Sequence, residues 1–186
     1  LATLLTQRMT KGYSINVKMI VIIKGEKAEK ETKCILRDNV EVEEGIDYIR
    51  IKGRDKINPV SIKTSPYPGF PTDLHPQMSV FLTCADGKSK ITEGIWELRF
   101  QYVDELKKMG AYISLDNRTA TIEGGHKLRG SNVFASDLRA GAALVLAGLI
   151  ADGVTCVYNV NYIDRGYERL EEKLVNLGAK IKRVVD

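Results

Sequence analysis

The sequence repeats one kind of junction three times, and this repetition restricts the folds that the chain can adopt. At each junction a segment expected to be helical reaches Asn or Gly, and alternating apolar and polar residues follow. Asn and Gly tolerate the left-handed backbone that ends a helix, and the alternation predicts a strand. The junctions lie at Asn39, Gly110 and Gly178, spaced by roughly 70 residues, which is typical of an internally repeated domain.

A second element repeats in step with the first. Apolar segments that we expect to be helices end at Gly12, Gly87 and Gly153, and a short strand follows each of them. Each unit therefore reads helix, strand, helix, strand, strand. Units of this kind cannot bury their apolar faces alone, so we expect them to pack together as a single domain. The three units are about 1–60, 61–124 and 125–186.

The predicted helices differ in character. Segment 140–150 is apolar on every side, which is typical of a buried central helix, and its small residues allow close approach of neighbours. Segment 24–33 is instead highly charged, as a solvated helix face would be. We expect the helix in 24–33 to be the least stable of the six.

Composition argues against several functional classes. The chain is 44% apolar and 28% charged, as expected for a globular protein. Its net charge of +4 is mild and its basic and acidic residues are interspersed, so charge predicts no nucleic-acid binding and suits an anionic small ligand equally well. No apolar run or opening signal predicts a membrane span or secretion. Leu1 is not a start methionine, so we expect further residues upstream.

The three cysteines predict reduced thiols in a cytoplasmic protein. Cys34, Cys84 and Cys156 form no CxxC pair, and only His75 and His126 could assist them in binding a metal, so we expect no zinc site. Because Cys84 and Cys156 lie in apolar runs, we expect both to be core residues.

All five prolines lie between positions 59 and 76. Proline fixes φ and removes an N–H donor, so this segment should be a stiff, extended approach to a helix that starts at Thr72-Asp73-Leu74. A carboxylate at a helix start is favoured, so Asp73 could serve only as an N-cap. The rigid approach is more than a cap requires, which also favours a functional carboxylate.

The same segment carries a family resemblance. Tyr67-Pro-Gly-Phe-Pro-Thr-Asp-Leu-His-Pro-Gln77 resembles a motif of the UDP-N-acetylglucosamine enolpyruvyl transferases, also called 1-carboxyvinyltransferases. Two further stretches, 135–148 and 162–179, are similar to later motifs of this family and occur in the same order. The resemblance is close from about residue 58 to the C-terminus and weaker before it.

The resemblance implies an α/β fold and a reaction. The fold is an inverse α/β barrel, as in EPSP synthase, in which three units surround a pseudo-threefold axis with helices inside and sheets outside. The reaction transfers enolpyruvyl from phosphoenolpyruvate to the 3-hydroxyl of UDP-N-acetylglucosamine and releases phosphate, in the first committed step of peptidoglycan synthesis. It requires a base, a proton donor and cations, and no metal or organic cofactor.

The resemblance also implies that this chain is one of two domains. The family's Lys-Asn pair, its mobile cysteine loop and its remaining phosphate-binding arginines belong to an N-terminal partner domain that this sequence lacks. We therefore expect the chain alone to be inactive.

The implied acceptor-sugar residues lie in two motifs. Asp73 matches the aspartate that hydrogen-bonds the sugar hydroxyl and can take its proton. Ile95 matches a position whose backbone touches the nucleotide sugar, and Trp96 stands where the family commonly has phenylalanine. Arg99 is retained and is either a site residue or a surface residue at a helix start, whereas Leu98 replaces the usual asparagine.

The remaining implied residues lie further along the chain. Asp137 and Arg139 match a pair at the mouth of the cleft, although Asp137 could be a helix cap. Arg165 matches an arginine that engages the phosphate and carboxylate of phosphoenolpyruvate, since a guanidinium can bind both groups through two parallel hydrogen bonds. Alternatively, Asp164 and Arg165 could form an exposed ion pair.

Two alternatives remain open. One is the sister enzyme that acts on shikimate phosphate, although none of its motifs is evident. The other is a truncated, non-catalytic paralogue that acts as a binding module, which Leu98 and the charged segment 24–33 would suit.

Overall fold

The computed structural model describes residues 2–7, 40–44, 49–53 and 56–185, which form both helices and strands. In chain order the elements are β1 Ala2–Gln7, β2 Val40–Glu44, β3 Ile49–Gly53, β4 Ser61–Lys63, the 3-10 turn η1 Thr72–Leu74, α2 His75–Leu82, β5 Lys88–Thr92, the 3-10 turn η2 Arg99–Tyr102, α3 Val103–Lys108, β6 Tyr112–Asp116, β7 Thr119–Glu123, β8 Asn132–Phe134, α4 Leu138–Ile150, β9 Val154–Tyr158, α5 Asn161–Asp164, α6 Leu170–Asn176 and β10 Lys180–Val185.

Two four-stranded sheets share one plan. Their strand orders are β4-β5-β7-β6 and β8-β9-β1-β10. In each sheet the first pair is parallel and the following pairs are antiparallel. Strand β1 therefore holds the place in its sheet that β7 holds in the other, although β1 comes from the opposite end of the sequence.

The position of β1 corrects one expectation. A helix ending at Gly12 was expected, but residues 2–7 form a strand that pairs with β9 and β10, for example through Leu4↔Val157 and Leu5↔Lys182. The two neighbouring edges offer unpaired N–H and C=O groups, and pairing with them outweighs the helical preference of Ala and Leu. Residues 8–12 lie outside the described part of the chain.

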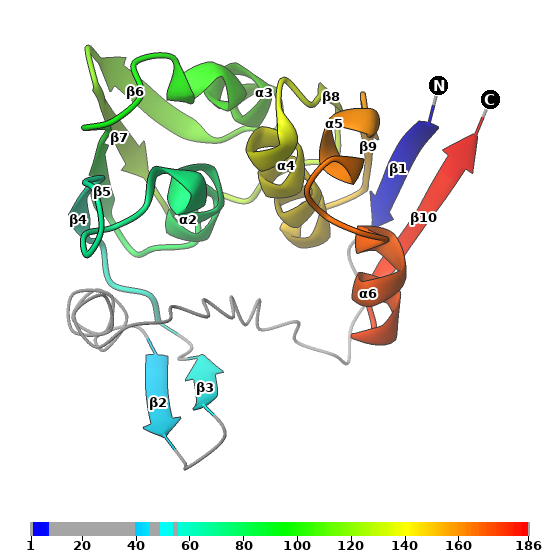
Figure 1. Cartoon of the computed structure of the whole chain (residues 1–186), viewed down its shortest axis with the longest axis horizontal. Helices are drawn as coiled ribbons and strands as arrows, with labels where there is room; N and C mark the ends of the chain where they lie inside the picture. The colour runs from blue at the N-terminus through cyan, green and yellow to red at the C-terminus, as the bar shows by residue number, and fades with distance from the viewer. Residues whose placement is uncertain (1, 8–39, 45–48, 54–55, 186) are drawn as a thin grey trace.

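Helices α2 and α4 pack against each other between the two sheets (Figure 1). Helix α4 is buried on almost all sides, which confirms the predicted central helix. A Cβ added at Gly141 would lie 2.5 Å from Ile163 Cγ1, so the missing side chain allows α5 to approach α4. This approach places the end of α5 beside the first turn of α4.

The helix ends predicted at Gly110 and Gly178 are confirmed, whereas α2 and α4 end at Leu82 and Ile150, before the expected Gly87 and Gly153. Gly87, Gly110, Gly153 and Gly178 all have positive φ and lie after helices. Strands β2 and β3 pair in antiparallel fashion, and β2 begins directly after Asn39, where a strand was expected. The charged helix expected at 24–33, Asn39 and Cys34 lie outside the described residues.

The expectation that two cysteines are core residues is wrong. Cys84 is exposed, because α2 has already ended at Leu82 and the chain has turned toward the surface. Cys156 is half-buried, because strand β9 directs its neighbours Thr155 and Val157 into the core and Cys156 to the other face. In the described part, no helix has the length and apolarity that crossing a membrane would require.

Candidate active site

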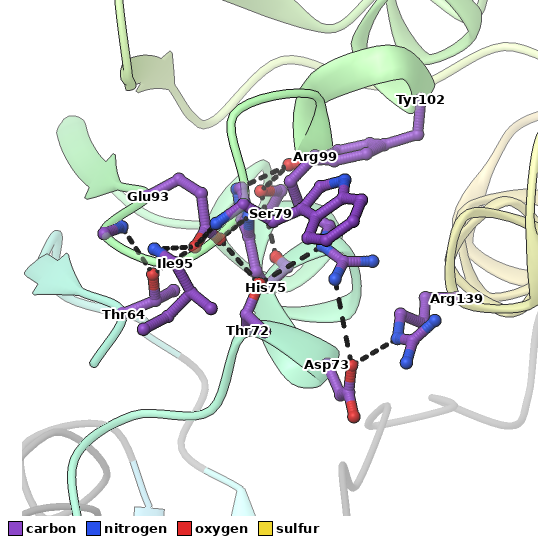
Figure 2. A network of polar contacts seen from close by, with 12 residues as sticks. Thr64, Thr72, Asp73, His75, Ser79, Glu93, Ile95, Arg99, Tyr102 and Arg139 are labelled. Carbon is purple, nitrogen blue, oxygen red and sulfur yellow. Dashed lines mark hydrogen bonds and ion pairs between the residues drawn. The ribbon is translucent and has the colours of Figure 1, made fainter. Parts of the chain in front are cut away.

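Asp73 lies in the turn η1 that leads into α2, and its carboxylate faces two arginines (Figure 2). It accepts a hydrogen bond from Arg139 Nε at the start of α4, and Arg99 Nη2 lies 4.0 Å from the same oxygen. Neither η1 nor α2 has a side-chain cap, because the α-helix proper begins two residues later, at His75. The interpretation of Asp73 as an N-cap is therefore wrong, and its side chain remains 60% exposed.

Asp137 does serve as a cap. Its Oδ1 accepts hydrogen bonds from the amides of Arg139 at 2.7 Å and Ala140 at 3.0 Å. This satisfies amides that the first turn of α4 would otherwise leave unpaired. The interpretation of Asp137 as a cap is confirmed. Because the capped amides belong to Arg139 and Ala140, the cap also fixes the backbone from which the Arg139 side chain extends.

Arg99 is not a surface residue. Its side chain is only 10% exposed, although it does lie at a helix start, in η2. Its Nε donates a hydrogen bond of 3.2 Å to the Thr72 hydroxyl, which comes directly before Asp73. The Arg99 guanidinium is therefore held on the Asp73 side of the turn.

A buried carboxylate that the sequence did not single out, that of Glu93, lies behind these residues. The side chains of Thr64, Thr72 and His75 hydrogen-bond it at 2.6, 2.8 and 3.0 Å. The amides of Ile95 and Trp96 donate to it at 2.7 and 3.1 Å. Ile95 and Trp96 themselves are 41% and 58% exposed, so an internal anion anchors an exposed apolar loop.

The ionisation of this network follows from its contacts. Burial opposes ionisation of Glu93, but the hydrogen bonds from Thr64, the Ile95 amide and Thr72 together lower its pKa. Burial lowers the pKa of His75 to about 4, against the opposing effect of Glu93, so the imidazole is neutral at neutral pH. A carboxylate only accepts hydrogen bonds, so His75 Nδ1 carries the proton.

The second ring nitrogen of His75, Nε2, also has a hydrogen-bond partner. With its proton on Nδ1, His75 Nε2 accepts from the Tyr102 hydroxyl at 3.0 Å. Burial raises the pKa of Tyr102, which keeps that hydroxyl protonated. Ser79 lies 2.6 Å from the same oxygen, so the network passes from α2 through Tyr102 and His75 to Glu93.

Only Gly94 could have revealed Glu93 in the sequence. A Cβ at Gly94 would lie 2.5 Å from the Thr64 carbonyl oxygen, so the chain turns tightly there. That turn directs the preceding Glu93 inward, whereas a Glu-Gly pair after a strand usually reads as the start of an exposed loop.

Arg165 lies at the end of α5, where its guanidinium covers the Tyr162 ring at 5.2 Å from the ring centre. Asp164 does not pair with it, because both carboxylate oxygens of Asp164 bind Arg183, at 2.7 and 3.0 Å. The interpretation of Asp164 and Arg165 as an exposed pair is therefore wrong. Gly166 packs against Leu138, which places the end of α5 next to Asp137 and Arg139.

Comparison with known proteins places this arrangement in a family. A family model described as EPSP synthase (3-phosphoshikimate 1-carboxyvinyltransferase) matches residues 8–174. The chain belongs to this family.

Relatives named UDP-N-acetylglucosamine 1-carboxyvinyltransferase confirm the resemblance seen in the motifs. One from Halothermothrix orenii is 52% identical over 145 residues, covering 78% of this chain and 35% of the relative. One from Clostridium botulinum is 50% identical over 156 residues, covering 84% of this chain and 37% of the relative. The chain thus spans little more than a third of the length of these relatives.

Solved structures agree with the family's fold. The enolpyruvyl transferase NikO from Streptomyces tendae superposes with a TM-score of 0.77 at 30% identity, covering 84% of this chain and 37% of that one. An EPSP synthase from Acinetobacter baumannii superposes with a TM-score of 0.68 at 20% identity, and the match covers 86% of this chain and 41% of that one. At this identity it shows the fold alone. The expected EPSP synthase-like α/β fold is confirmed at this level.

Taken together, the structure joins Asp73, Arg99 and Arg139 through ion pairs and places Asp137 at the base of the same helix. Ile95 and Trp96 lie on the loop before η2, where their amides bind Glu93. No contact between Arg165 and Asp73 is found among the described residues. The same part of the chain contains no group of three or more His, Cys, Asp or Glu side chains that could hold a metal ion.

Proposed function

We propose that this chain supplies one domain of a UDP-N-acetylglucosamine 1-carboxyvinyltransferase, which transfers enolpyruvyl from phosphoenolpyruvate to the sugar 3-hydroxyl and releases phosphate. The observation that carries the proposal is the environment of Asp73. Its carboxylate caps no helix, remains exposed and lies between two arginines that come from separate elements. A carboxylate held in this way without a structural task is suited to accept a proton from a bound hydroxyl.

The other residues take roles that suit their positions. Arg99 and Arg139 orient the Asp73 carboxylate, and the exposed Ile95 and Trp96 form the surface against which the acceptor sugar lies. Asp137 fixes the first turn of α4 and thereby the backbone position of Arg139. Arg165, exposed beside that turn, engages the phosphate and carboxylate of phosphoenolpyruvate through its planar guanidinium.

The proposal extends to the domain as a whole. The matching plans of the two four-stranded sheets support repeated units, about 61–124 and 125–186, the second completed by β1 from residues 2–7, and we infer that the rest of 1–60 forms a third unit around the same axis. A partner domain supplies the proton donor and the remaining cations, so residues 1–186 alone form no product. The reaction uses no metal or organic cofactor, and the enzyme acts in the cytoplasm.

A non-catalytic binding module is the second candidate. Leu98, which is 68% exposed, stands where the family usually has asparagine, and an exposed apolar side chain suits a surface that binds without catalysing. A module would bind the nucleotide sugar, but it would show no turnover even when joined to a partner domain.

The decisive experiment uses an enzyme that contains this domain and compares Asp73→Asn with Arg165→Lys. We expect Asp73→Asn to lower kcat by roughly 100-fold, because the amide can still hydrogen-bond the hydroxyl but cannot take its proton. We expect Arg165→Lys mainly to raise KM for phosphoenolpyruvate, because lysine keeps the charge and loses the paired hydrogen bonds.

Asp86→Asn is the matched control, because Asp86 carries an exposed ion pair to Lys56 outside this cluster. Steady-state measurement of kcat and both KM values separates the outcomes. Unchanged turnover in Asp73→Asn would overturn the proposed catalytic role of Asp73.

A further inference from the structure

We propose that Glu93 and His75 are positioning residues for the acceptor-sugar side of this site. From the interior they fix the conformation of the Ile95–Trp96 loop and the position of the Arg99 guanidinium. The inference rests on the proposed function, in which UDP-N-acetylglucosamine is the acceptor substrate.

One oxygen of Glu93 organises the loop. Oε1 accepts from the Thr64 hydroxyl and from the amides of Ile95 and Trp96, and the Gly94 amide donates to the Thr64 hydroxyl oxygen at 2.8 Å. Three consecutive amides thus converge on one buried carboxylate and the threonine bound to it. Charged hydrogen bonds of this kind are stronger than neutral ones, so the loop's conformation depends on the charge of Glu93.

The other oxygen reaches the arginine that faces Asp73. Oε2 accepts from the Thr72 hydroxyl and from His75 Nδ1. Since the carboxylate cannot donate, Thr72 must give its only hydroxyl proton to Glu93 and can face Arg99 only as an acceptor. Arg99 Nε donates to that acceptor at 3.2 Å, and Nη2 of the same guanidinium faces Asp73, so Glu93 fixes the Arg99 side chain through Thr72 (Figure 2).

The same contacts limit what Ile95 can offer a ligand. Its N–H is already committed to Glu93, whereas no hydrogen bond from the described residues reaches its carbonyl. The ligand group that meets the Ile95 backbone must therefore be a donor. A sugar hydroxyl or the N–H of an acetamido group fits this requirement, and a phosphate or carboxylate oxygen does not.

His75 allows the role of the Glu93 charge to be tested without breaking the fold. If Glu93 becomes Gln, the imidazole can move its proton to Nε2, accept from the new amide through Nδ1 and donate to Tyr102. Tyr102 can then donate to Ser79, which already donates to the His75 carbonyl oxygen at 3.1 Å. The Thr72 hydroxyl must then accept from the Gln amide instead of donating to a carboxylate, so the variant loses the negative charge and the acceptor of the Thr72 proton, while the other buried groups keep their partners.

Trp96 is the single tryptophan of the chain, so its fluorescence reports directly on this loop. The experiment compares Glu93→Gln and Thr72→Val with Glu97→Gln, a matched control on the same loop, because among the described residues the Glu97 carboxylate binds only the exposed Arg118. Each 186-residue variant is measured for thermal unfolding, for acrylamide quenching of Trp96, and for its response to UDP-N-acetylglucosamine.

We expect Glu93→Gln to unfold close to the wild-type temperature, to be quenched about twice as readily, and to bind UDP-N-acetylglucosamine roughly tenfold more weakly, as loss of a charged hydrogen bond predicts. Thr72→Val keeps the loop anchor but loses the link to Arg99, so we expect weaker binding with little change in quenching. Thr72→Val also serves as the second variant if Glu93→Gln does not fold. Glu97→Gln should match the wild type.

The outcomes separate this inference from the proposed function. Unchanged quenching in a folded Glu93→Gln overturns the loop anchor, and raised quenching with unchanged affinity overturns the role of Glu93 at the site. If neither the wild-type chain nor an enzyme that contains this domain binds UDP-N-acetylglucosamine, the proposed function of this domain fails, and quenching still decides whether Glu93 sets the loop.

Discussion

Asp73 and Arg139 lie 66 residues apart in the sequence, and their ion pair joins the entry of α2 to the first turn of α4. An Asp-Leu pair lies at the entry of both helices, yet only Asp137 caps its helix. The turn η1 separates Asp73 from the start of α2 and leaves its carboxylate available to the arginines. Two aspartates with the same local sequence therefore have different tasks.

This difference predicts unequal costs of substitution. We expect Asp137→Ala to lower the free energy of unfolding by about 1–2 kcal/mol, because it leaves helix amides unpaired. We expect Asp73→Ala to change it by no more than about 0.5 kcal/mol, because an exposed ion pair contributes little. Urea denaturation of both variants measures this, with Asp137→Asn as the control that keeps a cap. Equal costs would contradict the assignment.

The buried His75 predicts a pH dependence of stability. Its pKa is about 4 in the folded chain and 6.5 when unperturbed, so between these values only the unfolded chain binds the proton. Stability should therefore be complete above pH 6.5 and fall as the pH drops toward 4. From pH 7 to pH 5 we expect His75 to account for a loss of about 2 kcal/mol.

Replacement of each histidine isolates this effect. His75→Gln keeps a donor for Glu93 and an acceptor for Tyr102 but does not titrate, so the loss between pH 7 and pH 5 should shrink by that amount. His126→Gln should retain it, because His126 is exposed and stacks on Tyr112. Glu93, whose pKa is lowered, loses its contribution only at a pH below its usual range. Equal pH dependence in both variants would refute the prediction.

The contact between α4 and α5 predicts that Gly141→Ala is destabilising, although alanine favours helices. The new Cβ would lie 2.5 Å from Ile163 Cγ1 and 3.1 Å from Ala135 Cβ, so side chains must shift. We expect a cost of about 1–3 kcal/mol, typical of overpacking. In an Ile163→Ala background the clash with Cγ1 is gone, so the cost should be smaller. A double-mutant cycle without coupling would show that the clash is not the cause.

Burial predicts which amides exchange slowly with solvent. Helix α4 has buried residues along most of its length, whereas α6 has none. We expect the amides of α4 to exchange only on unfolding of the whole domain and those of α6 to exchange through local opening. Hydrogen exchange followed by NMR tests this, and slower exchange in α6 than in α4 would contradict the packing described here.

Features that depend on neighbouring residues were predictable from the sequence. The left-handed glycines after the helices, the burial of α4 and the cap at Asp137 each follow from a local pattern. Features that depend on distant partners were not. The strand β1 forms only because β9 and β10 provide edges for it, and Asp164 turns to Arg183 across 19 residues.

The candidate site shows the same division. Its motifs identified Asp73, Arg99 and Arg139, which the structure brings together. Glu93 and His75 escaped notice because their inward orientation depends on hydroxyls and amides from several elements, which no local pattern records.

The contrast between β7 and β1 has a consequence for how the chain folds during its synthesis. Strand β7 meets β6 across a short turn, so the sheet β4-β5-β7-β6 can close as soon as those residues emerge. Strand β1 is synthesised before β9 and β10 but can pair only after both have been made. Closing the long loop between β1 and β9 costs conformational entropy before the strand contacts offset it. We therefore expect the sheet that contains β1 to close last, in a slow step that leaves β1 available to wrong partners until the ribosome has delivered β10.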